Sequence, residues 1–489
     1  MNRLDRPGKQ FDGKNTSQPG TSHMQAEDFE LITYHGPITL SLEPLNAKPD
    51  MTRNTSSGLD RRDFLSASMA AAVSGPVATA DKTPPRRSSY SIKPVQAWDP
   101  TKNTFSPFFP IGWYSFGPQA RIEEIAENGA NSAVYAGLGS ESWHQSETLK
   151  RLDVAHKLGV KVVLGLGGSV VGKVVLGQPK TYGVIPEYVK TFNRHPAMLG
   201  WQMGDEFSEG AAPRINDTTA LLKQLGSRHP TWQVHPHTWS HGQVRKLMAR
   251  TDVCTYDGYT YLEGLGEFHT HSSARVLAWQ QAKADLIQAE GWAGNVNVTQ
   301  AVGCQCGTAK FRFPTAREYR WNVFSAIATA GARGTMNWIY SYSGGFYAND
   351  PKRFFRFRDD VVKPVNLEQR MIARAMETGY NVGEVRSNHD TLTKTTIPAA
   401  GGNHRPYNSL GHILLHDAKA GKYFLLATNN ESKPLDISLS LDKLPISLKS
   451  LEARDTHRKR TLTLQRDNPQ RFVLRDKLAP YDVALFVLS

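Results

Sequence analysis

Hydrophobic and polar positions follow two different patterns along the chain, and the change between them divides it into two parts. From Phe109 to Tyr340, apolar runs of strand length alternate with segments of helical periodicity. After His389, strand-length runs recur roughly every 8 to 12 residues without helices between them. The first pattern predicts repeated β-strand and α-helix units. The second predicts an antiparallel β-domain.

Eight apolar runs in the first part indicate β-strands: Phe109–Tyr114, Asn131–Tyr135, Lys161–Leu166, Met198–Glu206, Trp232–His237, Asp252–Asp257, Asn295–Val302 and Gly334–Tyr340. Helical patterns lie between or after them, at Ile122–Glu127, Glu147–Leu158, Ile185–Phe192, Thr218–Leu225, Gly242–Ala249, Ser273–Glu290, Glu318–Thr329 and Arg370–Met376. Eight such units predict an α/β fold, a closed (β/α)8 TIM barrel, over residues 105–380.

The second part carries its clearest strand patterns at His412–His416, Lys422–Thr428, Leu435–Leu439, Arg471–Leu474 and Val483–Leu488. Turn residues separate these runs, and no helical pattern interrupts them. We therefore expect a small C-terminal antiparallel β-sandwich over residues 389–489.

Residues 1–95 stand outside this organisation. Arg61-Arg62 precedes a mildly apolar, Ala- and Ser-rich stretch that ends in Ala78-Thr79-Ala80. This segment resembles a twin-arginine export signal with a small-residue cleavage site. Met51, rather than Met1, would place the arginine pair at an ordinary distance from a chain start. We expect a leader that is removed or disordered, and a periplasmic or secreted protein. A chance arginine pair before an Ala-rich helix is the alternative.

Composition and charge narrow the class of protein. Hydrophobic residues make up 39% of the 489 residues and charged ones 21%, which is typical of a globular protein. No run approaches the roughly 20 apolar residues of a transmembrane helix. The net charge of +13 suits an anionic polysaccharide, or it reflects solvated segments such as His457–Arg460. No motif indicates nucleic-acid binding, and three cysteines are too few for a disulfide scaffold.

Candidate chemistry lies at the carboxyl ends of the predicted strands, where barrel enzymes carry their reacting groups. The fourth run ends in Asp205 and Glu206, and an apolar strand that finishes in two carboxylates is typical of a site. A salt-bridged pair that fixes a loop is the alternative. Further strand-end residues are expected to bind substrate, because aromatic rings beside hydrogen-bonding groups suit sugars. This set comprises Tyr135, His235, His237, Trp239, Tyr256, Gln300, Asn337, Trp338 and Tyr340.

The segment Leu199-Gly200-Trp201, running into Gly204-Asp205-Glu206, is similar to the fourth-strand acid/base segment of clan A (β/α)8 glycoside hydrolases, particularly β-galactosidase-like members. Asn128–Val134 resembles their entry to the second strand. The resemblance implies a poly- or oligosaccharide substrate and no cofactor. It assigns Glu206 as general acid/base, and it implies that Asp205 hydrogen-bonds a sugar hydroxyl.

The seventh strand departs from that resemblance. Retaining members of the clan carry a nucleophilic glutamate where this chain has Gln300, and an amide cannot form the glycosyl ester. Three interpretations stay open. The enzyme inverts, with Asp257 or Glu263 as base. Strands four and six end about 10 Å apart, near the carboxylate separation that inversion needs. Alternatively, the substrate supplies its own nucleophile, or the barrel binds glycans without cleaving them.

A metal-dependent hydrolase is the rival enzyme class. His235 and His237 point the same way along a strand, so together with Asp205 or Asp257 they offer a set of metal ligands. The alternative is that one histidine lines a sugar pocket and the other packs in the barrel wall.

Overall fold

A computed structural model of the chain describes residues 90–116, 121–135, 142–237, 239–306, 309–340, 351–382, 384–390, 392–395, 405–442, 444, 452–468 and 470–488. The predicted export signal lies outside the described residues. Tyr90 and Ile92 are buried and belong to the main hydrophobic core.

Eight parallel strands close into a barrel in the order β12-β3-β4-β5-β6-β7-β8-β9, which confirms the predicted (β/α)8 fold. The strands are β3 (Ile111–Phe116), β4 (Ser132–Tyr135), β5 (Lys161–Gly165), β6 (Met198–Asp205), β7 (Thr231–Pro236), β8 (Val253–Asp257), β9 (Ala293–Gln300) and β12 (Gly334–Trp338). Most of these strands begin and end within about two residues of the predicted limits. Their inward side chains form the barrel core.

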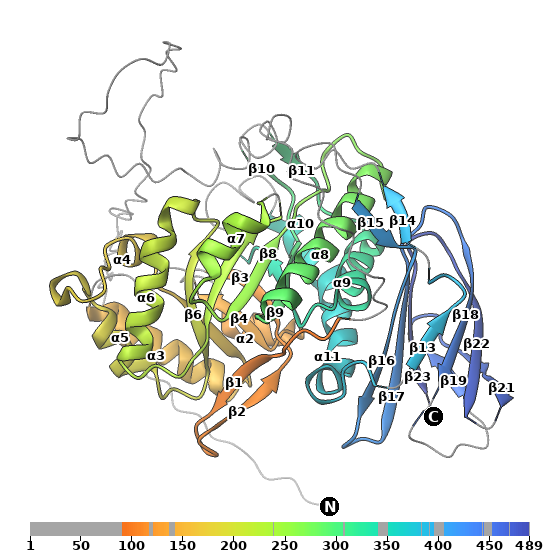
Figure 1. Cartoon of the computed structure of the whole chain (residues 1–489), viewed down its shortest axis with the longest axis horizontal. Helices are drawn as coiled ribbons and strands as arrows, with labels where there is room; N and C mark the ends of the chain where they lie inside the picture. The colour runs from red at the N-terminus through yellow and green to blue at the C-terminus, as the bar shows by residue number, and fades with distance from the viewer. Residues whose placement is uncertain are drawn as a thin grey trace, which may run out of the picture. The chain divides into compact units, whose positions relative to one another are not determined.

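Helices surround these strands (Figure 1). They are α2 (Ile122–Glu127), α3 (Ser142–Lys157), α4 (Gly168–Val171), η2 (Pro179–Thr181), α5 (Ile185–Phe192), η3 (Glu209–Ala211), α6 (Ala212–Gln224), α7 (His241–Met248), α8 (Thr270–Glu290), α9 (Ala316–Ala330), α10 (Pro351–Phe357), η4 (Arg358–Val362) and α11 (Lys363–Thr378). Local chemistry sets the ends of α9: Thr315 and Glu318 form a capping box, and Gly331 ends the helix at φ 62°. None of these described helices combines the length and apolar character needed to cross a membrane.

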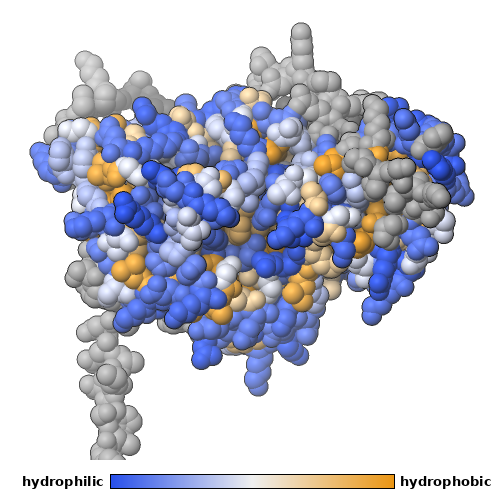
Figure 2. Space-filling model, turned by 90° about the horizontal axis from the view of Figure 1, so that it is seen from below, coloured by the Kyte–Doolittle hydropathy of each residue, from blue (hydrophilic) through white to orange (hydrophobic). Residues whose placement is uncertain are grey.

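A hairpin of β1 (Val95–Asp99) and β2 (Thr104–Phe108) lies at the amino end of the barrel strands. Lys161, the first residue of β5, donates from Nζ to the Trp98 carbonyl at 3.4 Å, and Lys93 bridges to Ala293 at the start of β9. Figure 2 views the molecule from below, where hydrophilic residues surround small hydrophobic areas. The opposite end, where the strands finish, is the end that carries sites in this fold.

The C-terminal region forms antiparallel sheets, as predicted. One sheet has the order β13-β18-β22-β21 and a second the order β16-β17-β23-β19-β20. The strands of this region are β13 (Glu384–Ser387), β14 (Leu392–Thr395), β15 (Arg405–Asn408), β16 (Leu410–Asp417), β17 (Lys422–Asn429), β18 (Leu435–Asp442), β19 (Glu452–Asp455), β20 (Arg460–Thr463), β21 (Gln465–Asn468), β22 (Arg471–Leu478) and β23 (Val483–Leu488). Leu414, Leu439 and Phe486 are among the buried residues of a separate core.

Polar contacts join this β-domain to helix α9 of the barrel. Arg320 of α9 donates to the Val483 carbonyl of β23 at 2.8 Å, and it also donates to both carboxylate oxygens of Glu368 on α11, at 2.7 and 3.0 Å. The indole of Trp321 donates to the Asn429 carbonyl at 3.2 Å. The two folded parts therefore share a buried, hydrogen-bonded boundary.

Candidate active site

The register of the barrel strands shows which side chains face its interior. Gln202 on β6 donates to the hydroxyl of Tyr114 on β3, and these strands are not neighbours in the barrel. Both side chains must therefore reach across the interior. Tyr114 pairs in register with Trp338, and Trp338 pairs with Gln300. Because paired residues of parallel strands project to the same face, Trp338 and Gln300 also point inward.

The same reasoning places the acid residues. Asp257 pairs with Val298, two residues before Gln300, and so faces inward at the end of β8. Asp205 pairs with Val234, which pairs with Thr255 on the inward side of β8. The structure thus brings Asp205 and Asp257 to the inner side of one rim, from strands separated by β7.

Glu206 follows directly and adopts an unusual backbone. Its φ is 54°, in the left-handed region that a residue with a side chain rarely adopts, and its side chain is only 8% exposed. The Glu206 amide still donates to the Val234 carbonyl at 3.2 Å, so the backbone turns away immediately after the last ladder bond. A left-handed backbone costs roughly 1 to 3 kcal/mol and is typical of functional positions.

Asp257 is held by an aromatic pair. The Tyr259 hydroxyl donates to Asp257 Oδ2 at 2.8 Å. The Tyr259 ring stacks on Trp338, with centroids 4.6 Å apart and an interplanar angle of 23°. Asp257 is 2% exposed and Trp338 is fully buried. The carboxylate at the end of β8, the phenol two residues beyond it and the indole at the end of β12 therefore form one wall inside the rim.

Gln300 stands where the resemblance leads one to expect a nucleophile, and its amide is engaged by backbone. Nε2 lies 2.8 Å from the Arg312 carbonyl, 3.2 Å from that of Val302 and 3.3 Å from that of Tyr261. Oε1 accepts from the Tyr261 amide at 3.1 Å. The side chain is fully buried. Through these contacts, Gln300 holds the backbone of the two loops that follow β8 and β9.

Several predicted substrate-binding residues face the helices instead, which corrects their expected placement. The Tyr256 hydroxyl donates to the Gln280 carbonyl of α8 at 3.3 Å. Asn337 accepts from the hydroxyl of Tyr319 on α9. Alternate residues of a strand point to opposite faces, and the pattern of these apolar strands does not reveal which face each side chain takes.

Tyr340 and Tyr135 are likewise bound to outer helices. The Tyr340 hydroxyl donates to Glu124 of α2 and accepts from Arg358 Nη1 at 2.9 Å. The Arg151 guanidinium of α3 lies 5.6 Å from the centre of the Tyr135 ring. These contacts explain the two tyrosines as parts of the barrel wall.

His235 and His237 also lie on the helix side of β7. His235 pairs in register with Tyr256, and its ring lies 5.9 Å from that of Trp239. His237 lies 3.7 Å from the Trp279 ring of α8, and its Nδ1 lies 2.8 Å from the Asp257 carbonyl. Burial lowers the pKa of His237 to about 3 and that of His235 well below its usual range. Both imidazoles are neutral at physiological pH.

This placement argues against the metal-dependent alternative. Both histidines face α8, whereas the Asp257 side chain faces the barrel interior. Within the described ranges, His, Cys, Asp and Glu form no group of three that could hold a metal ion.

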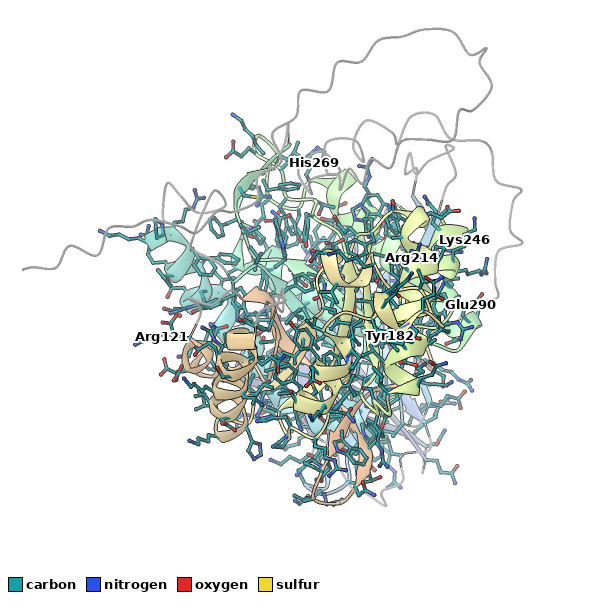
Figure 3. The ribbon with its side chains drawn as sticks, turned by 90° about the vertical axis from the view of Figure 1, so that its left-hand side faces the viewer. Arg121, Tyr182, Arg214, Lys246, His269 and Glu290 are labelled. Carbon is teal, nitrogen blue, oxygen red and sulfur yellow. The ribbon has the colours of Figure 1, made fainter. Side chains whose placement is uncertain are left out.

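Ion pairs join several surface charges of the barrel helices and of the β-domain. Arg458 contacts Asp476 at 3.0 Å, and Arg460 pairs with the same carboxylate. On the barrel helices, Lys246 pairs with Glu209, and Arg245 pairs with Glu290 at 2.6 Å. Figure 3 shows Lys246 and Glu290 at the outer edge of this face. Arg458 and Arg460 of the basic segment are thus paired with carboxylates of their own domain.

Two inward residues were not recognised from sequence. Gln202 interrupts an apolar strand, a signal that a polar side chain enters the barrel. Tyr259 follows Asp257-Gly258 just after β8, where an aromatic residue could have been added to the strand-end set.

No protein-family model matches the chain, and no curated protein matches its sequence. Among solved structures, it is similar to a glycoside hydrolase family 5 protein from Bacteroides vulgatus ATCC 8482, with a TM-score of 0.51 and 11% identity over 80% of this chain and 93% of that one. Weaker similarity reaches a family 5 mannosidase from Rhizomucor miehei (TM-score 0.41, 11% identity, 58% and 98% covered) and AbfB, a family 51 α-L-arabinofuranosidase from Bifidobacterium longum (TM-score 0.42, 12% identity, 82% and 98% covered). At such identities the likeness shows the fold alone.

Proposed function

We propose that this protein is a glycoside hydrolase that cleaves O-glycosidic bonds of a poly- or oligosaccharide at the carboxyl end of the barrel. One observation carries the proposal: Asp205 and Asp257 face inward from β6 and β8, with Glu206 directly after Asp205. The Tyr259–Trp338 stack stands beside Asp257. Most glycoside hydrolases cleave the glycosidic bond with two carboxyl groups that flank it.

In the proposed reaction, Glu206 donates its proton to the glycosidic oxygen as the bond from that oxygen to the anomeric carbon breaks. Asp257 accepts a proton from a water molecule whose oxygen bonds to the anomeric carbon from the opposite face. Asp205 binds a sugar hydroxyl. Strands two apart end about 10 Å from each other, which leaves room for that water in an inverting arrangement.

Gln300 supports inversion over retention. An amide held by backbone groups of Tyr261 and Arg312 has no carboxylate oxygen to attack the anomeric carbon. The same residue favours a second candidate function, a barrel that binds glycans without cleaving them. Hydrolysis itself distinguishes the two.

The test compares wild type with Glu206→Gln and the control Glu209→Gln on a panel of neutral and uronate-bearing polysaccharides. Glu209 lies three residues further along the chain, at the start of η3, and pairs with Lys246 on the surface. We expect wild type and the control to release reducing sugar, and Glu206→Gln to be slowed about 100-fold or more. Binding of glycan by all three proteins without release would establish the binding function instead.

We also propose that the protein is exported by the twin-arginine route. The support is sequence alone, Arg61-Arg62 followed by a mild apolar stretch and Ala78-Thr79-Ala80. Cell fractionation of the full chain and of the Arg61→Lys, Arg62→Lys double variant tests it. Retention of the variant in the cytoplasm supports export, and an equal distribution contradicts it.

A further inference from the structure

The loops that follow β8 and β9 form a small sheet of their own over one side of the rim. The Glu263 amide donates to the Lys310 carbonyl at 2.8 Å, and the Arg312 amide donates to the Tyr261 carbonyl at 2.9 Å. Leu262 bridges to Phe311 between them. Strand β11 (Ala309–Phe311) in turn pairs with β10 (Cys304–Cys306), and both lie at the top of Figure 1. We call residues 260–263 and 304–312, excluding 307 and 308, the rim sheet.

Gln300 fastens the rim sheet from inside the barrel. Its amide forms a two-point contact with the peptide groups of Tyr261, accepting from N at 3.1 Å and lying 3.3 Å from O. It also reaches the Arg312 carbonyl at 2.8 Å. One side chain at the end of β9 therefore holds both halves of the sheet.

A separate ion pair fastens the outside of the same loops. Arg312 binds Glu318 through two nitrogens, each 2.7 Å from a carboxylate oxygen. Glu318 also accepts from the Phe268 amide at 2.8 Å. Figure 3 labels His269, the next residue, near the top of the molecule. Because this pair does not involve Gln300, we expect the loops to stay folded when Gln300 is changed.

The anchored backbone lies two residues beyond Tyr259, which holds Asp257 and stacks on Trp338. We propose that Gln300 is a positioning residue: by binding Tyr261 and Arg312, it fixes the backbone that presents the Tyr259 hydroxyl to Asp257. The anchoring is independent of any reaction, whereas its effect on turnover rests on the proposed hydrolase function.

This role demands an amide rather than an acid. Three carbonyl oxygens surround Nε2, so a carboxylate oxygen in its place would repel them, and only a protonated acid would supply a donor. Gln300→Glu should therefore loosen the rim sheet when its carboxyl is ionised and restore part of the contact when it is protonated. If position 300 were instead the site of a catalytic nucleophile, Gln300→Glu would restore that nucleophile and raise activity.

Asn297 provides a matched control. It is a buried amide on the same strand, but it faces α8, where Oδ1 accepts from Gln280 at 3.5 Å and Nδ2 donates to Thr299 at 2.9 Å. Asn297→Asp makes the same chemical change three residues away, on the other side of the sheet.

The experiment measures hydrogen exchange of the full chain by mass spectrometry at about pH 5 and about pH 8, each variant against wild type at the same pH. We expect Gln300→Glu to speed exchange of residues 260–263 and 309–312 by about tenfold at the higher pH and less at the lower one. Asn297→Asp should leave these segments unchanged. Wild-type exchange in Gln300→Glu at both pH values, or equal loosening by Asn297→Asp, would overturn the proposal.

Turnover supplies a second readout. On any glycan that wild type cleaves, Gln300→Glu should lower kcat by about tenfold with little change in KM, because the hydroxyl of Tyr259 is misplaced while the ring surface persists. Faster hydrolysis by Gln300→Glu would overturn the positioning role. If wild type cleaves none of the panel, the hydrolase proposal fails while the exchange result still decides the role of Gln300.

Discussion

The Tyr259 hydroxyl donates to Asp257 Oδ2 at 2.8 Å from a position only two residues further along the chain. The intervening Gly258 lets the backbone pass close to the His237 ring, because a Cβ there would lie 2.9 Å from Nδ1 of His237. The arrangement gives Asp257 a fixed direction inside the rim, which suits its proposed role as the base that activates water.

Tyr259→Phe tests the importance of that hydrogen bond. The variant keeps the ring that stacks on Trp338 and removes only the hydroxyl. We expect kcat on a cleaved glycan to fall by about tenfold to 100-fold, with KM changed little, since the stacked pair of rings is preserved. Steady-state kinetics checks this, and unchanged kcat would show that Asp257 needs no such support.

Glu206→Asn tests whether the left-handed backbone stores strain. Asparagine tolerates a φ of 54° better than glutamate does, so relief of strain should raise the free energy of unfolding by about 1 kcal/mol. Hydrolysis should be lost at the same time. Urea unfolding monitored by tryptophan fluorescence measures the stability. A less stable variant would mean that the Glu206 side chain contributes more to folding than its backbone costs.

Gly200→Ala should damage the strand that carries the acid pair. A Cβ on Gly200 would lie 2.3 Å from Nε1 of Trp232 and 2.6 Å from the Pro230 carbonyl, far inside contact distance. We expect a loss of about 3 kcal/mol in the free energy of unfolding.

Gly210→Ala is the control for this change, because its Cβ would meet only Ser208 Oγ at 3.9 Å. Its stability should stay within about 0.5 kcal/mol of wild type. Equal thermal unfolding of the two alanine variants would contradict the close packing of β6 on Trp232.

The free energy of unfolding should fall as the solution becomes acidic, because the fold keeps buried histidines neutral whereas the unfolded chain lets them bind protons. Burial lowers the pKa of His229 to about 4, and the side chain is 4% exposed. The unfolded chain takes up that proton near pH 6.5, whereas the folded chain does not. The contribution of neutral His229 to the free energy of unfolding is therefore fully present above about pH 6.5. It is lost at about 1.4 kcal/mol per pH unit as the pH falls toward 4.

His229→Gln isolates this contribution. Glutamine does not titrate, and its amide can still donate to the Asn193 carbonyl that His229 Nε2 contacts at 2.9 Å. The fall in unfolding free energy between about pH 6.5 and pH 5 should lessen by roughly 2 kcal/mol. A pH dependence equal to that of wild type would show that His229 gains its proton without cost in the fold.

The barrel was predictable because its signal lies in the repeat of strand and helix. Met198–Glu206 is an example, since the strand in the structure runs over Met198–Asp205. Strands such as β2 and β10, with five and three residues, are too short to show such a pattern.

The sequence does not predict which face of the sheet each strand side chain takes. His235 and Tyr256 were expected at the ligand side and instead face α8, while Asp257, one residue beyond Tyr256, faces inward. Register irregularities between Gln202 and Gly204 and between Cys254 and Thr255 shift which residue lies opposite which. A one-residue shift of register moves every side chain of a strand to the other face of the sheet, and the pairing with neighbouring strands determines the register.

Time-resolved proton NMR of the first sugar released from a cleaved glycan shows whether Glu206 and Asp257 act together to invert the anomeric centre. We expect the new anomeric proton to appear first in the configuration opposite to that of the substrate linkage, and we expect Asp257→Asn to abolish the signal. Initial release of sugar in the retained configuration would overturn inversion, because retention requires two successive displacements through a covalent glycosyl-enzyme intermediate instead of direct attack by water.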